Sequence, residues 1–227
     1  MLDTRTPSVA RAYDYLLGGE ASFAADRALA ARLAALYPRL GENLLSSRTL
    51  VADSVAHIAR QGVDQYLDVG AGLPTMPSAH STARALLPAA RVVYIYRDPV
   101  VVTHGTALVP RGVRYQDGDL TEPEALLAAL AFIDFSRPVC LILALVVQAI
   151  EPGTARAVVG VLVKALPPGS YLVATVGAGD QGRLPDSVWA AAATEADLTS
   201  FFGGLDLLPP GITRRGEVLG AAGVKRG

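Results

Sequence analysis

Residues 65–75 read Gln65-Tyr66-Leu67-Asp68-Val69-Gly70-Ala71-Gly72-Leu73-Pro74-Thr75. A five-residue run that predicts a strand comes directly before two glycines at a GxG spacing, and a helical pattern follows. Glycines at such a turn let the backbone approach a ligand and enter the helix sharply. A tight turn that binds nothing is the alternative. The stretch predicts a strand–turn–helix unit with a ligand at the turn.

The glycine pattern also indicates the kind of ligand. A dinucleotide-binding turn carries a third glycine, and position 75 is Thr. The sequence therefore argues against NAD and favours a nucleoside ligand that lacks a pyrophosphate.

After this unit, strand-like runs alternate with helical patterns along the chain. The predicted strands are Gln65–Val69, Arg91–Tyr96, Val113–Gln116, Pro138–Leu145, Ser170–Val176 and Leu205–Leu208. The predicted helices between them are Pro77–Leu87, Val100–Leu108, Glu122–Leu130, Thr154–Leu166 and Asp186–Phe202, the last broken near Thr194. This alternation is typical of a doubly wound α/β domain with a mostly parallel sheet.

The first 62 residues predict helices only. One helix is expected to open at Thr6-Pro7, a second to be capped by Ser22, and a third to span about 41–60. The predicted organisation is an N-terminal helical cap over 1–62 and an α/β domain over 63–227, forming one compact unit.

Composition excludes several classes of protein. The 227 residues are 51% hydrophobic and 18% charged with a net charge of -1, so neither disorder nor nucleic-acid binding is expected. The most apolar run, Val139–Val147, is shorter than the roughly 20 residues of a membrane span. The N-terminus lacks the apolar core of a signal peptide, and Cys140 is the only cysteine, which fits a reducing cytoplasm. No spacing of His, Cys or carboxylates suggests a metal.

The ends of the second and third predicted strands carry candidate binding residues. A nucleoside site normally has an acid at the second strand end to accept from ribose hydroxyls, but Tyr96 stands there and Asp98 follows. Asp98 could substitute for that acid, or Tyr96 could reshape the pocket; the alternative is that Asp98 only caps the next helix. After the third strand, Asp119 beside Leu120 could accept from an exocyclic amine, or could serve turn chemistry alone.

Three further residues are candidates for catalysis. His80 follows the glycine turn as a possible general base, although an ordinary helix residue is the alternative. Gln148 follows the fourth strand and can hydrogen-bond. Tyr15, with Tyr13, could stack on a ligand or donate a hydroxyl, or could belong to a helix core. Trp189 could line a substrate pocket or pack on the sheet.

Several blocks of residues carry a resemblance to a known family. They are Tyr13-Asp14-Tyr15-Leu16-Leu17-Gly18-Gly19, Phe23-Ala24-Ala25-Asp26-Arg27, Leu67–Thr75, Arg91-Val92-Val93-Tyr94, Asp98-Pro99-Val100-Val101, Asp134-Phe135-Ser136-Arg137-Pro138 and Pro168-Gly169-Ser170-Tyr171-Leu172. From about Pro7 to Gly211 the chain resembles the S-adenosyl methyltransferase family of high-GC bacteria.

The resemblance implies a class I methyltransferase fold, with S-adenosylmethionine (SAM) in the crevice and the N-terminal helices closing over it. The site residues that it implies are Gly70, Gly72, Asp119 and, from the cap, Tyr13, Tyr15, Phe23 and Arg27.

The chain departs from the family pattern at ligand-facing positions. Tyr96 replaces the ribose-binding acid, which puts SAM binding in question. Glu20 and Ser22 replace a Lys and an Asn in the cap, and Gln148 replaces a His. Because the scaffold blocks are kept, these changes indicate a stable fold with an altered pocket.

Three functions follow as expectations. The first is a SAM-dependent methyltransferase acting on a small molecule, in specialised metabolism. The second is a repurposed methyltransferase fold that catalyses a cyclisation or rearrangement, with or without SAM. The third is a non-catalytic small-molecule-binding protein. A homodimer is compatible with each of them, and neither a nucleic acid nor a membrane is expected as a partner.

Overall fold

An eight-stranded sheet forms the centre of the chain in the computed structural model, which describes residues 3–178 and 193–227. The strands are β1 (Gln65–Val69), β2 (Arg91–Tyr96), β3 (Val113–Asp117), β4 (Cys140–Ala144), β5 (Tyr171–Gly177), β6 (Asp206–Leu207), β7 (Thr213–Arg215) and β8 (Val218–Val224). Their order is β3-β2-β1-β4-β5-β8-β6, and β7 pairs with β8.

Strands β1 to β5 pair in parallel, and β8 runs antiparallel to its three neighbours. The strand order reverses between β1 and β4. In an open parallel sheet, a ligand binds beyond the carboxyl ends of the strands at such a reversal. The topology therefore places the expected site next to the glycine turn after β1.

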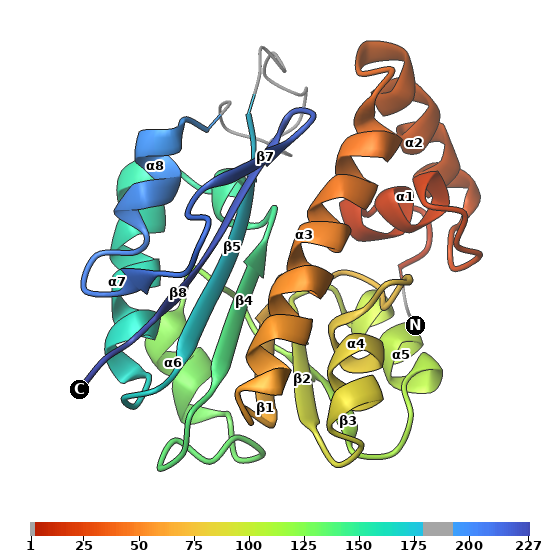
Figure 1. Cartoon of the computed structure of the whole chain (residues 1–227). Coiled ribbons are helices and arrows are strands. Elements are labelled where there is room, and N and C mark those ends of the chain that lie inside the picture. The colour runs from red at the N-terminus through yellow and green to blue at the C-terminus, as the bar shows by residue number, and fades with distance from the viewer. Residues whose placement is uncertain (1–2, 179–192) are drawn as a thin grey trace.

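Helices cover both faces of the sheet (Figure 1). They are α1 (Val9–Leu16), α2 (Ala24–Leu36), α3 (Leu40–Arg60), α4 (Ala79–Leu86), α5 (Pro99–Leu108), α6 (Pro123–Ala128), α7 (Pro152–Ala165) and α8 (Glu195–Ser200). Successive strand residues alternate between two core clusters, because side chains along a strand point to opposite faces. Leu67 packs with α6, α7 and α8, whereas Tyr66 packs with α3 and α4. The predicted doubly wound α/β fold is confirmed.

Helix α3 belongs both to the sheet and to the cap. Its first turns, with Leu40 and Leu44, pack with α1 and α2. Its later turns, with Val55 and Ile58, pack against the sheet. Figure 1 shows α3 running from the α1–α2 pair along the face of the sheet. The boundary at residue 62 stays a prediction, but α3 itself joins the two predicted parts.

All six predicted strands are present, with ends that shift by up to two residues. Strands β7 and β8 were not predicted. Strand β8 is rich in Gly and Ala, residues that do not signal a strand. Its glycines serve close packing, since a Cβ on Gly223 would lie 2.8 Å from Phe202 Cδ1.

Two predicted helix starts are wrong. Helix α1 begins after Ser8, not Thr6, and α2 begins after Phe23, not Ser22. In both cases the Asp26 carboxylate fixes the residue before the helix. It accepts from the backbone N–H of Ser8 (2.7 Å), which is distant in the chain, and from that of Phe23 (2.8 Å), three residues before it. Thr194 caps α8, so a helix begins at the position of the predicted break; the part of that predicted helix before residue 193, with Trp189, lies outside the described residues.

None of the described helices has both the length and the apolar character that a bilayer crossing requires. Within 3–178 and 193–227, no group of three His, Cys, Asp or Glu side chains is placed to hold a metal ion.

Candidate ligand-binding site

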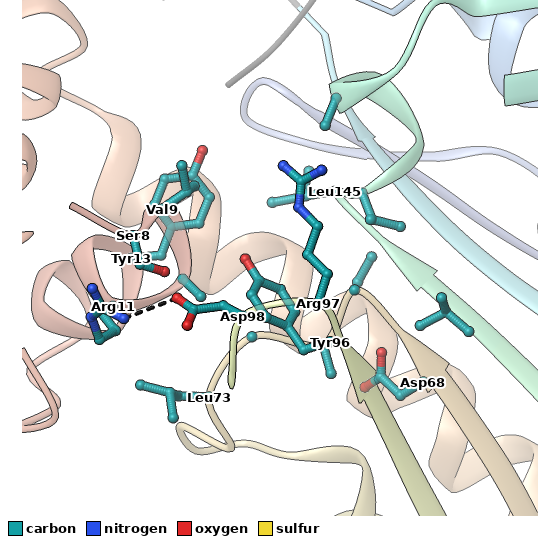
Figure 2. Close-up of a pocket in the computed structure, with 18 of the residues that line it drawn as sticks. Ser8, Val9, Arg11, Tyr13, Asp68, Leu73, Tyr96, Arg97, Asp98 and Leu145 are labelled. Atoms are coloured by element: carbon teal, nitrogen blue, oxygen red, sulfur yellow. Dashed lines mark hydrogen bonds and ion pairs between the residues drawn. The ribbon is translucent and has the colours of Figure 1, made fainter. Parts of the chain in front are cut away.

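A cavity of about 910 Å³ lies where the sheet topology predicts a ligand. Its volume falls within the range of about 300–1,000 Å³ that is typical of small-molecule sites. The lining comes from the ends of β1, β2, β3 and β4 on one side and from the N-terminal segment, α1 and α3 on the other. Figure 2 shows these side chains converging from both sides.

The two glycines after β1 both have a positive φ, and at the first of them packing also excludes a side chain. Gly70 has a φ of 78°, and a Cβ there would lie 2.2 Å from Val146 Cγ2. Gly72 has a φ of 64°, and a Cβ there would lie 3.4 Å from Ala10 Cβ. The turn therefore sits between the β4 exit and α1, and both glycines line the cavity. Their contact with a ligand stays a prediction.

Asp68, the fourth residue of β1, lines the cavity but was not among the predicted site residues. Its carboxylate is buried and lines the cavity, and Oδ1 has no hydrogen-bond partner. Burial raises the pKa of Asp68 to about 7, although the nearby Arg48 guanidinium counteracts part of that rise. The sequence could have indicated Asp68 as a site residue, because it is an acid two residues before the first glycine. Its burial without a partner depends on tertiary structure.

The loop after Gly72 is held by side chains from distant elements. Arg48 of α3 donates to the carbonyl oxygens of Leu73 (2.9 Å) and Thr75 (2.7 Å). Tyr115 of β3 donates to the carbonyl oxygen of Gly72 (2.9 Å). On the cap side, Thr75 Oγ1 donates to Asp14 Oδ1 at 2.5 Å. These interactions fix the backbone of the loop from three directions, and no local sequence pattern reveals them.

Tyr96 occupies the β2 exit and packs towards the cap. Its ring lies against a small apolar cluster of Ala10, Leu73 and Val101. Burial raises the pKa of Tyr96 to about 12, so the phenol is neutral at pH 7. The structure therefore places an uncharged aromatic side chain where a nucleoside site normally has a carboxylate.

Asp98 lines the cavity but has both oxygens engaged within the protein. Oδ1 accepts from the backbone N–H of Val100 (2.8 Å), so Asp98 is the N-cap of α5. Oδ2 pairs with Arg11 Nη1 (2.9 Å), as Figure 2 shows. The capping alternative is confirmed, and a direct contact with ribose stays a prediction.

Arg97 and Asp119 lie near each other at the open side of the cavity. Arg97 Nη1 is 3.9 Å from Asp119 Oδ2, and the Arg97 side chain is 77% exposed. Burial acts to raise the pKa of Asp119, but hydrogen bonds from Thr121 outweigh it and the pKa is lowered. Those bonds, from the Thr121 backbone N–H (2.9 Å) and hydroxyl (2.8 Å), form the turn interaction that the sequence left open. Leu120 beside it also lines the cavity.

None of the three predicted catalytic residues, His80, Gln148 and Tyr15, lines the cavity. His80 Nδ1 is 2.8 Å from the Tyr94 hydroxyl, behind the glycine turn, and burial lowers the pKa of His80. Gln148 is buried in the 3-10 turn after β4, where its Oε1 accepts from the backbone N–H of Gly177 at 2.5 Å. Gln148 lines a separate small pocket of about 70 Å³.

The cap residues divide in the same way. Tyr13 lines the cavity, whereas Tyr15, two positions further along the helix, points away and is 45% exposed. Arg27 donates to the carbonyl oxygen of Ser22 (2.9 Å) and does not line the cavity, nor does Phe23. Tyr13 is thus the member of this predicted set that the structure brings to Gly70 and Asp119.

The fold and the site define a class I SAM-methyltransferase-like protein. The chain belongs to the S-adenosyl methyltransferase family, which matches residues 1–218, so the resemblance seen in the sequence is confirmed.

Two similar structures span nearly the whole chain. A candidate methyltransferase from Thermobifida fusca is 33% identical, with a TM-score of 0.88 over 99% of this chain and 97% of that chain. A DUF574 family protein from Streptomyces avermitilis is 28% identical, with a TM-score of 0.87 over 99% and 100% of the two chains.

A more distant structure shares the fold. The N-methyltransferase NodS from Bradyrhizobium japonicum, in complex with S-adenosyl-L-homocysteine (SAH), is 15% identical, with a TM-score of 0.53 over 77% of this chain and 85% of that chain. No curated protein matches the chain.

Proposed function

We propose that the chain binds SAM at the β1 exit and transfers the methyl group to a small molecule held in the same cavity. The observation that carries this proposal is the buried Asp68 carboxylate, which lines the cavity and whose Oδ1 has no partner. A buried acceptor without a partner is costly unless a ligand supplies a donor. The ammonium group at the amino-acid end of SAM is a suitable donor, and its charge would lower the pKa of Asp68 from about 7.

The cavity residues fit SAM at one end better than at the other. Asp68 suits the ammonium group, and Asp119 with Leu120 suits an adenine ring that has an exocyclic amine and an apolar face. At the ribose, Tyr96 offers a single neutral hydroxyl in place of a carboxylate. We therefore expect SAM affinity to rest on the β1 exit more than on the β2 exit.

The chain itself positions the reactants and excludes water. When bound, SAM supplies an electrophilic methyl group on a sulfonium. Val9, Leu44 and Leu145 line the cavity with apolar surface between the cap and the β4 exit, which suits a small acceptor with an apolar body. Methyl transfer depends mainly on orientation in a dry site, so this arrangement does not need a strong base.

Calorimetric titration with SAM and with SAH tests the proposal. The wild type should bind both, and Asp68→Asn should weaken binding by about 10- to 100-fold, the effect of losing a charge-assisted hydrogen bond. Asp117→Asn is the matched control, because Asp117 ends strand β3 of the same sheet, is exposed and does not line the cavity. If the wild type shows no binding at millimolar SAM and SAH, the proposal is wrong.

The β2 exit supports a second candidate function. Tyr96 makes the site less suited to a ribose than a carboxylate would, which favours a repurposed fold that performs a cyclisation or rearrangement. The two functions differ in mass balance. With SAM labelled in its methyl group, a methyltransferase yields labelled product and SAH, whereas the alternative yields an isomer of the substrate without label.

A further inference from the structure

Arg11 is the most completely engaged charged side chain at the site. It is 1% exposed, and its guanidinium makes three polar contacts. Nε pairs with Asp26 Oδ2 (2.8 Å), Nη1 with Asp98 Oδ2 (2.9 Å), and Nη2 donates to the carbonyl oxygen of Thr6 (2.9 Å). A guanidinium can bridge two carboxylates in this way because its donors point in fixed, divergent directions.

The two carboxylates belong to different parts of the molecule. Asp26 is fully buried in α2 and also accepts from the backbone N–H groups of Ser8 and Phe23, so it organises the cap. Asp98 follows β2 and caps α5, so it belongs to the sheet. Arg11 therefore ties the cap to the β2 exit, and Figure 2 shows its contact with Asp98 beside Tyr96 and Arg97.

Other contacts of α1 fall on the same ligand-facing loops. Ala10 packs against Tyr96 and Leu73, and a Cβ on Gly72 would be 3.4 Å from Ala10 Cβ. Asp14 accepts from Thr75 Oγ1. One short helix thus contacts the loops after both β1 and β2, which form much of the cavity wall.

We propose that Arg11 is a positioning residue for the nucleoside part of the ligand. By holding Asp98 Oδ2 it fixes the turn of residues 96–98 in the geometry that lines the cavity. Asp98 itself does not contact the ligand. Its pairing with Arg11 affects the ligand only by fixing the position of the turn. This inference rests on the proposed function, because the ligand used to test it is SAH.

The test compares four proteins: the wild type, Arg11→Lys, Asp98→Asn and the double variant. Lysine keeps a positive charge for Asp26 but lacks the fork that bridges both carboxylates. Asparagine remains a good N-cap, so Asp98→Asn removes the charge pair while keeping α5 capped. Both changes are milder than removal of the buried charge, which could unfold the cap.

The first readout is hydrogen exchange of the ligand-free proteins at the backbone amides within residues 96–101, Pro99 having none. Each single variant should exchange faster there, and the double variant should be no faster than the single variants. Asp64→Asn is the control, because it breaks an exposed pair with Arg137 (3.2 Å) before β1, and it should leave this exchange unchanged.

The second readout is the SAH affinity by calorimetry. Each single change should raise the Kd about tenfold, and the double variant should match the single variants, since both remove one shared interaction. This coupling in affinity is not expected of a merely structural pair. If both single variants keep the wild-type Kd within twofold, Arg11 has no positioning role.

An additive loss has a different meaning. If Asp98→Asn weakens SAH binding as much in the Arg11→Lys background as in the wild type, Asp98 contacts the ligand itself and the inference is overturned. If the wild type fails to bind SAH, the proposed function fails first. Unchanged exchange at residues 96–101 in both single variants would overturn the role of Arg11 independently of any ligand.

Discussion

The exits of β1 and β2 lie side by side at the same cavity but differ in what they leave free. At the β1 exit, Asp68 has a buried oxygen atom with no partner. At the β2 exit, Tyr96 packs against the cap, and both carboxylate oxygens of Asp98 are engaged by Val100 and Arg11. The first exit has an acceptor without a partner, whereas at the second exit the protein itself engages both oxygens of Asp98.

This difference shows that two adjacent strand exits at one cavity can differ in which polar groups they leave without a partner. A carboxylate at a strand exit is available to a ligand only if the protein itself does not satisfy it. Position alone therefore does not assign a binding role to Asp98. The missing partner of Asp68 does favour a binding role for that residue, since burial without a partner is a cost that a bound ligand can remove.

The largest effect is expected at the glycine turn of the β1 exit. Gly70→Ala would place a Cβ 2.2 Å from Val146 Cγ2 at a φ of 78°, and should lower the free energy of unfolding by about 3 kcal/mol or more. Gly72→Ala is the matched comparison, because its Cβ would meet Ala10 at 3.4 Å. It should cost only about 1 kcal/mol, mainly for its positive φ. Chemical denaturation measures both, and equal losses would contradict the packing argument.

The next effect is the pH dependence caused by Asp68. Its pKa in the folded state, about 7, lies above the unfolded value of 3.8, so the folded state binds more protons between these values. Stability should therefore fall as pH rises from 4 to beyond 7. Asp68→Asn mimics the protonated acid, so between pH 5 and pH 8 the wild type should lose about 2–3 kcal/mol more than the variant.

Denaturation of both proteins across this pH range measures that difference. Parallel curves for the wild type and Asp68→Asn would show that Asp68 keeps an ordinary pKa. SAH should bind the wild type more tightly at pH 8 than at pH 5, because the ionised carboxylate is the form that accepts from an ammonium group.

A smaller, opposite effect is expected when the β2 exit regains an acid. Tyr96→Asp should tighten SAH binding by about tenfold, because a carboxylate can accept from ribose hydroxyls. The same change should lower stability, since the contacts of the ring with Ala10, Leu73 and Val101 are lost. Calorimetry and thermal unfolding measure the two effects. Tyr96→Phe serves as the control, because it keeps the ring and should leave stability within about 1 kcal/mol.

Strand alternation and glycine spacing were enough to predict the main body of the fold. Apolar runs such as Arg91–Tyr96 form strands because both of their faces are buried, and that pattern is visible in the sequence. Strand β8 was not predicted because its glycines are needed for close packing against residues from other elements, such as Phe202. Local propensity carries no information on such contacts.

The site was predicted only in part, for a related reason. Gly70, Gly72 and Asp119 follow strands, and the topology brings strand exits together. Arg11 and Arg48 were not recognised, because their roles depend on partners from other elements, Asp98 and the carbonyl oxygen of Leu73. Gln148 was predicted at the ligand site but lies outside the main cavity, because the 3-10 turn after β4 directs its side chain to the backbone N–H of Gly177.

The smallest effect is expected behind the β1 exit, at His80. Its ring pairs with the Tyr94 hydroxyl at 2.8 Å, and burial lowers the pKa of His80, so at pH 7 the ring is neutral and engaged away from the cavity lining. His80→Ala should lower stability by about 1 kcal/mol through the lost partner of Tyr94, and should leave the SAH Kd within twofold. A general base contacts the reacting group directly or through one water, so a large loss of activity without loss of SAH binding would restore a catalytic role for His80. An unchanged pH profile of activity between pH 5.5 and 7.5 in His80→Ala would instead leave Asp68 as the group that gives the β1 exit its pH dependence.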